Sequence, residues 1–174
     1  NNDNNEYKKE HCISTNGNNG PVIQIKDNEI CYHEYNNNNS LIYFYDLIEK
    51  KIINKIKNIS VTKYFFDSML MISNDLLIIT GENKISLLNV NTHKLIKIID
   101  ASGSSYIYAA VLLNKNMLLT ADKNKRIIQW RIEGNNLKLI YKKENAHDKR
   151  INIISKIGNG MILSGGEDDF IKIW

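Results

Sequence analysis

Three side chains near the end of the sequence are of the types that carry out acyl transfer. They are His147, Ser164 and Asp168. Hydrolases attack carbonyl groups with a serine hydroxyl that a histidine activates and a carboxylate orients. In one large class the serine lies in a Gly-x-Ser-x-Gly elbow between a strand and a helix. Ser164 lacks this elbow, and no helical pattern follows it. We therefore predict that the chain is not an enzyme.

Residues that bind phosphate or metal in other proteins also lack the required context here. Gly158, Gly160, Gly165 and Gly166 lie close together, but no helix follows that would direct backbone N–H groups at a phosphate, so hairpin turns are predicted instead. His11-Cys12 and Cys31-x-His33 form the one near cluster of metal-ligand types, and their spacing is unlike that of a zinc site. The sequence predicts neither a metal nor a cofactor.

Composition describes a globular chain without an extreme charge. Its 174 residues hold 23 Lys and Arg against 19 Asp and Glu, so the net charge of +4 does not by itself indicate a nucleic-acid partner. The chain has 29 Ile, 26 Asn and 20 Lys but three Arg, a bias that AT-rich codons explain.

Localisation follows from what the sequence lacks. No apolar run approaches the roughly 20 residues of a membrane span, and the polar first residues do not resemble a signal peptide. Cys12 and Cys31 are expected to stay reduced. We expect a protein of the cytoplasm or nucleus.

The elements that hold these side chains are predicted to be strands. Short segments rich in isoleucine and aromatic residues are bounded by Asn, Asp, Gly or Ser, which is typical of strands joined by tight turns. The segments are 22–25, 41–45, 76–79, 84–88, 126–130 and 170–174. The isoleucine-rich segment 50–57 is also interpreted as a strand.

These strands recur with a nearly constant period. Tyr45, Leu88, Trp130 and Trp174 each end a strand of the same kind, and they are 43, 42 and 44 residues apart. After each of the first three lies a further Ile/Leu-rich strand, and before each lie a small-residue turn and another apolar strand. Four strands in about 43 residues correspond to one blade of a β-propeller.

The repeating unit resembles the WD-repeat β-propeller family. Its best match runs from Ala146-His147 through the apolar strand 151–154 to the hairpin 161–174, which ends at Trp174. A second match covers 117–130, and degenerate copies lie at 80–88 and 41–46, so the resemblance extends over about residues 21–174. The chain departs from the family pattern in having Ala146 in place of Gly and no Asp after Trp130.

The resemblance implies an all-β propeller segment of about four four-stranded antiparallel blades that form an incomplete ring. The blades are expected at 21–60, 61–102, 103–146 and 147–174, and the last lacks its outer strand. Residues 1–20 form an Asn-rich leader, in which 6–13 resemble the outer strand of a blade. The remaining blades are expected from a longer chain.

The resemblance also gives the acyl-transfer residues a structural role. It places His147, Ser164, Asp168 and Trp174 in a hydrogen-bond network that fixes the geometry of the last blade. Thr120 and Trp130 keep part of this network in the third blade, where Asn124 replaces the Asp and no His precedes. We therefore expect the third blade to depend more on apolar packing.

A face for partners is predicted from the same alignment. Tyr106 and Tyr108 enter an innermost strand on the side where WD-repeat proteins usually dock partners, and Arg150 and Asn152 occupy the matching positions of the next blade. Tyrosine and arginine dominate binding hot spots. The predicted docking set is Tyr106, Tyr108, Lys123, Arg150, Asn152 and Glu167.

The expected function is a non-catalytic scaffold that docks protein or peptide partners on this face. The alternative is an electropositive platform for RNA or an anionic membrane, because basic residues concentrate between 123 and 150. We expect nucleic acid to be the less suitable partner, because it also requires clustered exposed aromatic residues.

Overall fold

The protein is described by a computed structural model that covers residues 12–15, 17–36, 39–57, 59, 68–101, 103 and 106–174. In this part of the chain fifteen strands form four antiparallel sheets, and Gly158–Gly160 form a single 3₁₀ turn. The all-β prediction is therefore confirmed. The strand expected over residues 6–13 lies largely outside the described residues.

Each sheet contains consecutive strands, in the order in which they occur in the chain. We call the sheets first to fourth. The first sheet comprises β1 (Asn18–Lys26), β2 (Glu29–Asn36), β3 (Asn39–Asp46) and β4 (Lys51–Lys57); the second, β5 (Met69–Met71), β6 (Leu76–Thr80), β7 (Lys84–Asn89) and β8 (Lys94–Asp100); the third, β9 (Ile107–Asn114), β10 (Met117–Asp122), β11 (Ile127–Ile132) and β12 (Leu137–Lys143); the fourth, β13 (Ile151–Lys156), β14 (Ile162–Gly166) and β15 (Ile171–Ile173).

The turns between the third and fourth strands show why the chain folds back where it does. In the first sheet the Asp46 carboxylate accepts hydrogen bonds from the backbone N–H groups of Ile48 and Glu49, both at 2.8 Å. In the second sheet the Asn89 side-chain oxygen accepts hydrogen bonds from the backbone N–H groups of Asn91 and Thr92. A short Asp or Asn side chain that bonds the backbone two or three residues ahead stabilises a turn.

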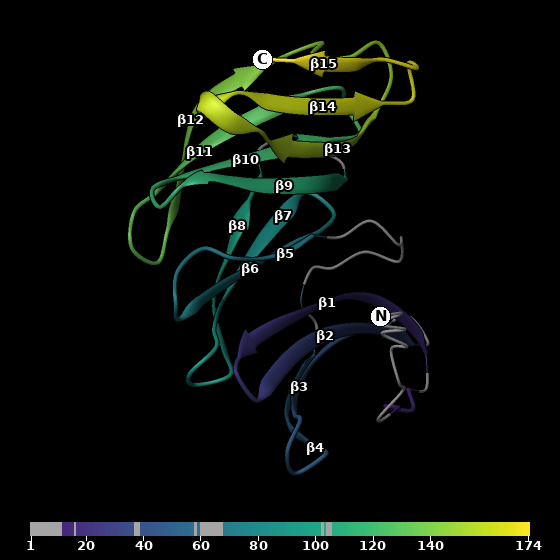
Figure 1. The fold of residues 1–174 in the computed structure, drawn as a ribbon, viewed down its shortest axis with the longest axis vertical. Coiled ribbons are helices and arrows are strands. Elements are labelled where there is room, and N and C mark those ends of the chain that lie inside the picture. Colours follow the sequence, from purple (N-terminus) through teal and green to yellow (C-terminus); the bar gives the residue numbers. More distant parts are fainter. Residues whose placement is uncertain are drawn as a thin grey trace, which may run out of the picture.

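The sheets stack in chain order, and apolar side chains fill the space between them. Figure 1 shows the stack from the purple first sheet to the yellow fourth sheet, each turned relative to the one before. Three buried clusters lie between successive pairs of sheets. The largest contains Leu87 and Ile85 of the second sheet and Ile128 and Trp130 of the third. Each cluster draws on two sheets, so no sheet buries its apolar faces alone.

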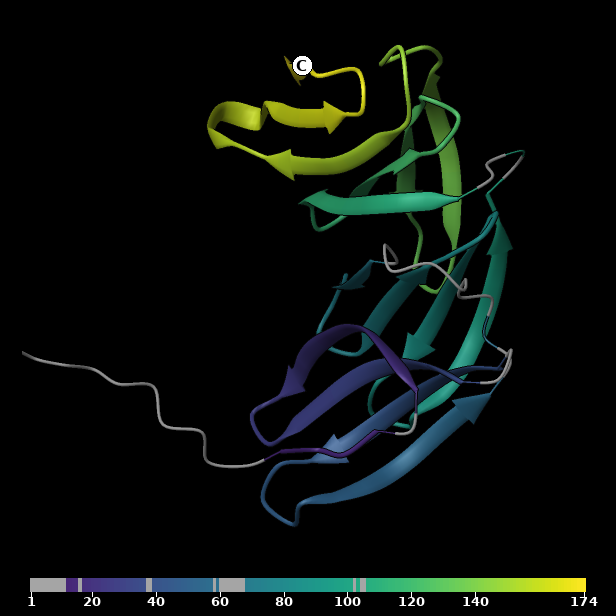
Figure 2. The ribbon, with the colours of Figure 1, turned by 90° about the vertical axis from the view of Figure 1, so that its right-hand side faces the viewer.

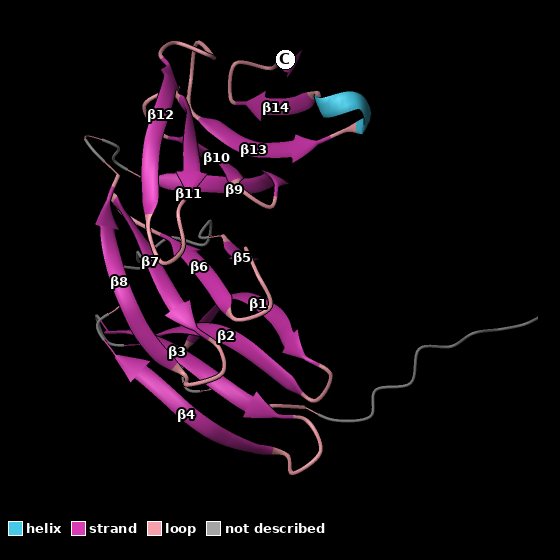
Figure 3. Ribbon diagram, turned by 90° about the vertical axis from the view of Figure 1, so that its left-hand side faces the viewer, coloured by secondary structure: helices cyan, strands magenta, loops and turns pink. Residues whose placement is uncertain are grey.

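The stack is an open arc. Figure 2 shows the first and fourth sheets at opposite ends of it, and the sheets do not close into a ring. The first strands β1, β5, β9 and β13 contact one another in succession, whereas β4, β8 and β12 lie along the other side (Figure 3). The fold is thus a propeller segment, as predicted, with a fourth sheet of three strands.

The apolar side chains at the end of the arc are exposed. Ile171 and Ile173 of β15 are 76% and 66% accessible, whereas Ile128, at the centre of the arc, is fully buried. An isoleucine at the centre of the arc should therefore contribute far more to the free energy of unfolding than one at its end.

We predict that Ile128→Ala lowers the free energy of unfolding by about 2–5 kcal/mol, because it leaves a cavity between the second and third sheets. Ile173→Ala is the matched control and should change it by about 0.5 kcal/mol or less. Urea-induced unfolding followed by tryptophan fluorescence measures both. Equal effects of the two substitutions would contradict the stacking described here.

Candidate functional site

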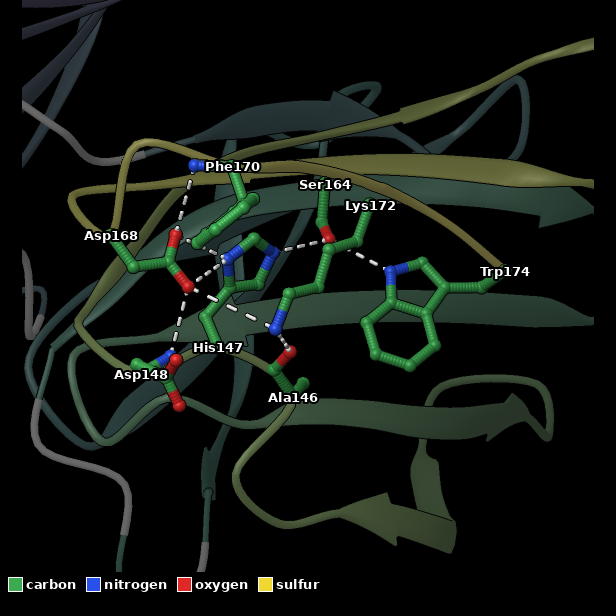
Figure 4. Close-up of polar contacts among 8 residues, drawn as sticks. All are labelled: Ala146, His147, Asp148, Ser164, Asp168, Phe170, Lys172 and Trp174. Atoms are coloured by element: carbon green, nitrogen blue, oxygen red, sulfur yellow. Dashed lines mark hydrogen bonds and ion pairs between the residues drawn. The ribbon is translucent and has the colours of Figure 1, made fainter.

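The acyl-transfer residues meet in the fourth sheet, but in a buried chain of hydrogen bonds. His147 lies in the turn before β13, Ser164 on β14, Asp168 in the turn between β14 and β15, and Trp174 directly after β15. The His147 ring contacts the Asp168 carboxylate through Nδ1 at 2.8 Å and the Ser164 hydroxyl through Nε2 at 2.7 Å. The Trp174 indole N–H donates to the same hydroxyl oxygen at 2.8 Å. Figure 4 shows the histidine between its two partners.

The Asp168 carboxylate is the charged end of this series of hydrogen bonds. In addition to its contact with His147, it accepts hydrogen bonds from the backbone N–H groups of Asp148 at 2.9 Å and Phe170 at 3.4 Å. Burial alone would raise the pKa of the Asp168 carboxyl, but these hydrogen bonds and the adjacent His147 lower the pKa to about 2. Lys172 lies 3.9 Å from the carboxylate and donates to the Ala146 carbonyl at 2.8 Å. The carboxylate therefore holds the turn before β13 against the turn after β14.

Donors and acceptors in this series of hydrogen bonds match when the His147 proton is on Nδ1. Nδ1–H then donates to Asp168, Nε2 accepts from the Ser164 hydroxyl, and the hydroxyl oxygen accepts from Trp174. Ser164 is 1% exposed and His147 is fully buried. A nucleophile must reach its substrate, whereas buried polar groups in a satisfied network fix local geometry.

Gly166 explains why the hairpin can approach the histidine so closely. A Cβ atom at this position would lie 2.8 Å from His147 Nδ1 and 2.9 Å from both the Arg150 carbonyl oxygen and Asp168 Oδ1. Real side chains do not tolerate such approaches. In the same turn Asp169 has a φ of 65°, in the left-handed region that residues other than Gly, Asn and Asp rarely adopt.

The third sheet stabilises the corresponding hairpin with different contacts. The Trp130 indole N–H donates to the Thr120 hydroxyl at 2.9 Å, and both residues are buried. The carboxylate of Asp122 forms an ion pair with Arg126 at 2.7 Å, and Arg126 also donates to the Gly103 carbonyl at 2.6 Å. We expected this blade to depend more on apolar packing, and the structure adds a buried ion pair that this expectation did not include. Asp122 and Arg126 flank a tight turn four residues apart, but this spacing does not show that the two side chains are buried together.

The predicted docking residues lie at one end of β9 and β13, and five of the six form a continuous run of contacts. The Tyr106 and Tyr108 rings stack with centroids 6.2 Å apart. Lys123 Nζ lies 5.2 Å from the Tyr106 ring centroid, and the Arg150 guanidinium lies 5.3 Å from that of Tyr108. Arg150 is also 2.6 Å from the Glu167 carboxylate. We call these five residues the docking row.

Two more residues and a backbone hydrogen bond belong to the surroundings of the docking row. Asn152, the sixth predicted residue, is exposed on β13. Glu82, which sequence reasoning missed, forms an isolated β-bridge with Tyr106 and so brings the second sheet to the end of the row. The Lys123 N–H donates to the Tyr106 carbonyl at 2.9 Å, which fixes the β10–β11 turn beside the ring. In the fourth sheet the Glu167 backbone N–H donates to the Arg150 carbonyl at 3.0 Å, so backbone contacts from three sheets position the row.

Metal and ligand sites have little support in the part of the chain that the structure covers. No group of three His, Cys, Asp or Glu residues among the described residues could hold a metal ion. A groove of about 390 Å³ lies between the third and fourth sheets and is lined mainly by apolar residues, among them Leu113, Tyr141 and Trp174. No helix formed by the described residues is long and apolar enough to cross a membrane.

The indole hydrogen bonds give one test of the two networks. Thr120→Val keeps the size of the side chain but leaves the buried Trp130 N–H without an acceptor, so we predict a loss of about 1–3 kcal/mol in the free energy of unfolding. Ser164→Ala should cost a similar amount, because it removes a partner of both His147 and Trp174. Chemical denaturation measures both losses. Wild-type stability in either variant would show that these hydrogen bonds contribute nothing.

The low pKa of Asp168 gives a second test. The carboxyl titrates near 3.8 in the unfolded chain and near 2 in the folded chain. Its contribution to stability is therefore complete above pH 3.8 and is lost as the pH falls toward 2. We predict that Asp168→Asn is less stable than wild type at neutral pH and that the difference shrinks across this window. Urea midpoints measured at successive pH values check this, and a constant difference would contradict it.

Comparison with known proteins supports the fold. No family model matches the chain, and no curated protein sequence matches it. Solved structures do match. The WD40 β-propeller domain of Doa1 matches with a TM-score of 0.70 at 15% identity, over 92% of this chain and 51% of that chain. U3-55K matches with 0.74 at 8% identity, over 93% and 50%. A chain of the mitotic checkpoint complex matches with 0.66 at 14% identity, over 84% and 45%.

These identities establish similarity of fold alone. The chain spans about half the length of the solved chains that it matches. In its fold, the chain is similar to one half of a WD40 β-propeller domain.

Proposed function

We propose that the chain is a non-catalytic interaction scaffold that docks a protein or peptide on the face containing the docking row. The observation that carries this proposal is the unbroken run of contacts from Lys123 through Tyr106, Tyr108 and Arg150 to Glu167. Tyrosine and arginine are the residue types that contribute most binding energy at protein interfaces. Here they are gathered from separate turns onto one surface.

The docking row is held in place before any partner arrives. Each ring contacts a neighbouring ring and a cation, and Arg150 is fixed by both Tyr108 and Glu167. Side chains that are already ordered lose little conformational entropy when they bind, so more of the contact energy appears as affinity. A rigid arc of stacked sheets is well suited to present such a surface.

Non-catalytic function is supported by the burial of Ser164, whose hydroxyl is already hydrogen-bonded to His147 and Trp174.

Protein partners are supported by the fold comparison, since one matching chain comes from a structure of the mitotic checkpoint complex. Cys12 and Cys31 are both free thiols, which suits a reducing compartment. Residence in the cytoplasm or nucleus is therefore part of the proposal.

Affinity capture with paired variants tests this proposal. The chain carrying Tyr106→Ala and Arg150→Ala should stay folded, because both side chains are half-buried and lie beside the first residues of β9 and β13. It should lose the partners that the wild type captures from extracts of cells that make the protein. The control carries Lys115→Ala and Asn116→Ala in the turn at the opposite end of β9, and it should capture the same partners as the wild type.

Circular dichroism of all three proteins confirms that the fold is retained. Capture of an identical set of proteins by the wild type and both variants would overturn the proposed docking face. Hydrolytic activity that disappears in Ser164→Ala would overturn the proposal that the protein is non-catalytic.

A further inference from the structure

The positive charge of the molecule is concentrated on the three outermost strands. Residues 51–57, 94–100 and 137–143, which form β4, β8 and β12, contain eight lysines and one aspartate. Their net charge is +7, whereas that of the whole chain is +4, so the remaining residues carry −3. We call these three strands the outer rim.

Compositional bias does not account for this placement. The outer rim comprises 21 of the 174 residues but holds 8 of the 20 lysines. The other twelve strands contain 73 residues in total and four lysines. A bias of the genome would distribute lysine among the strands without regard to their place in the fold.

Apolar side chains lie between the lysines and are exposed. All the rim lysines are exposed except Lys142, which is half-buried. Between them, seven large apolar residues are between 36% and 55% accessible: Ile52, Ile53, Ile96, Ile98, Leu139, Ile140 and Tyr141. Surfaces that bind the interface of an anionic bilayer combine cationic side chains with apolar ones that enter the boundary between headgroups and acyl chains.

The rim strands are joined into one surface. They follow one another along the same side of the arc (Figure 3). Asn54 on β4 donates to the His93 carbonyl beside β8 at 2.9 Å, and Lys97 on β8 donates to the Asn136 side chain beside β12 at 2.9 Å. Glu49 and Glu144 pair with Lys51 and Lys142 near the ends of their strands, and the rim's one carboxylate, Asp100, is the last residue of β8.

The apolar residues favour lipid over RNA. Single-stranded nucleic acid is bound by aromatic side chains on which bases stack, with arginine beside them. The outer rim contains no arginine, and Tyr141 is its one aromatic residue. Its exposed apolar residues are otherwise isoleucine and leucine, which stack poorly with bases but partition into the acyl region of a bilayer.

We propose that the outer rim docks the protein edge-on to a membrane surface rich in anionic lipid. Lysines from neighbouring sheets contact the headgroups, and the isoleucines between them enter the interface. The docking row belongs to other strands and turns, so a protein partner and a membrane can be bound together. This inference does not depend on the function proposed above.

Co-sedimentation of the 174-residue chain with lipid vesicles tests the proposal. The probes are vesicles of phosphatidylcholine alone and vesicles of phosphatidylcholine and phosphatidylserine in a two-to-one ratio. We expect binding to the anionic vesicles that weakens as salt is added and no binding to the neutral ones. Lys55→Glu, Lys94→Glu and Lys138→Glu, one on each rim strand, should together lower the partition coefficient by at least about tenfold.

The matched control carries the same change of charge away from the rim, as Lys115→Glu, Lys149→Glu and Lys156→Glu, and should bind as well as the wild type. Neutral Lys→Gln versions of both triple variants provide a second comparison if a charge reversal impairs folding. Ile98→Asn with Ile140→Asn should weaken the binding that remains at high salt.

Three results would overturn the proposal. The first is an absence of binding to anionic vesicles. The second is an equal loss of binding in rim and control variants, which would reflect net charge alone. The third is binding of a fluorescent polyuridine that depends on the rim lysines while vesicle binding does not, which would assign the rim to RNA.

Discussion

The structure depends on apolar packing between neighbouring sheets. Each of the three buried clusters takes side chains from two sheets, so a sheet acquires a complete core only when another lies against it. The hydrophobic effect rewards this contact in proportion to the apolar area removed from water, and in this chain that area lies on the faces of the sheets. The stacking order follows from this constraint, and Ile171 and Ile173 are exposed because no described sheet covers them.

Much of this arrangement could be predicted from the sequence because the signal is repeated. The spacing of Tyr45, Leu88, Trp130 and Trp174 identifies the third strand of each sheet, and a period of about 43 residues leaves room for four strands. The register explains one detail of the pattern. In the third and fourth sheets a hydroxyl residue, Thr120 or Ser164, is the cross-strand partner of the residue two positions before the tryptophan. In the second sheet, where Leu88 stands in place of the tryptophan, the equivalent partner is Ile79. An indole N–H requires an acceptor, and a leucine side chain does not.

The rest could not be predicted because it depends on contacts between turns. Asp122 and Arg126 are ordinary surface residue types, and only the fold reveals that they are buried together and reach Gly103. The run from Lys123 to Glu167 joins turns more than forty residues apart, so the sequence named candidates for the docking row but gave neither their stacking nor their ion pair. The charge of the outer rim was likewise hidden, because lysine is frequent throughout the chain.

The open arc also has a dynamic consequence. The second and third sheets have a neighbour on both sides, whereas the first and fourth have one each among the described residues. In assemblies held by nearest-neighbour interfaces, the end units open more readily than the central ones. For the 174-residue chain by itself we therefore expect amide hydrogens of β2 and β14 to exchange with solvent through local opening events that leave β6 and β10 protected. A partner bound to the proposed docking row would suppress such opening of the fourth sheet, so occupancy of the row and rigidity of the arc would be thermodynamically linked.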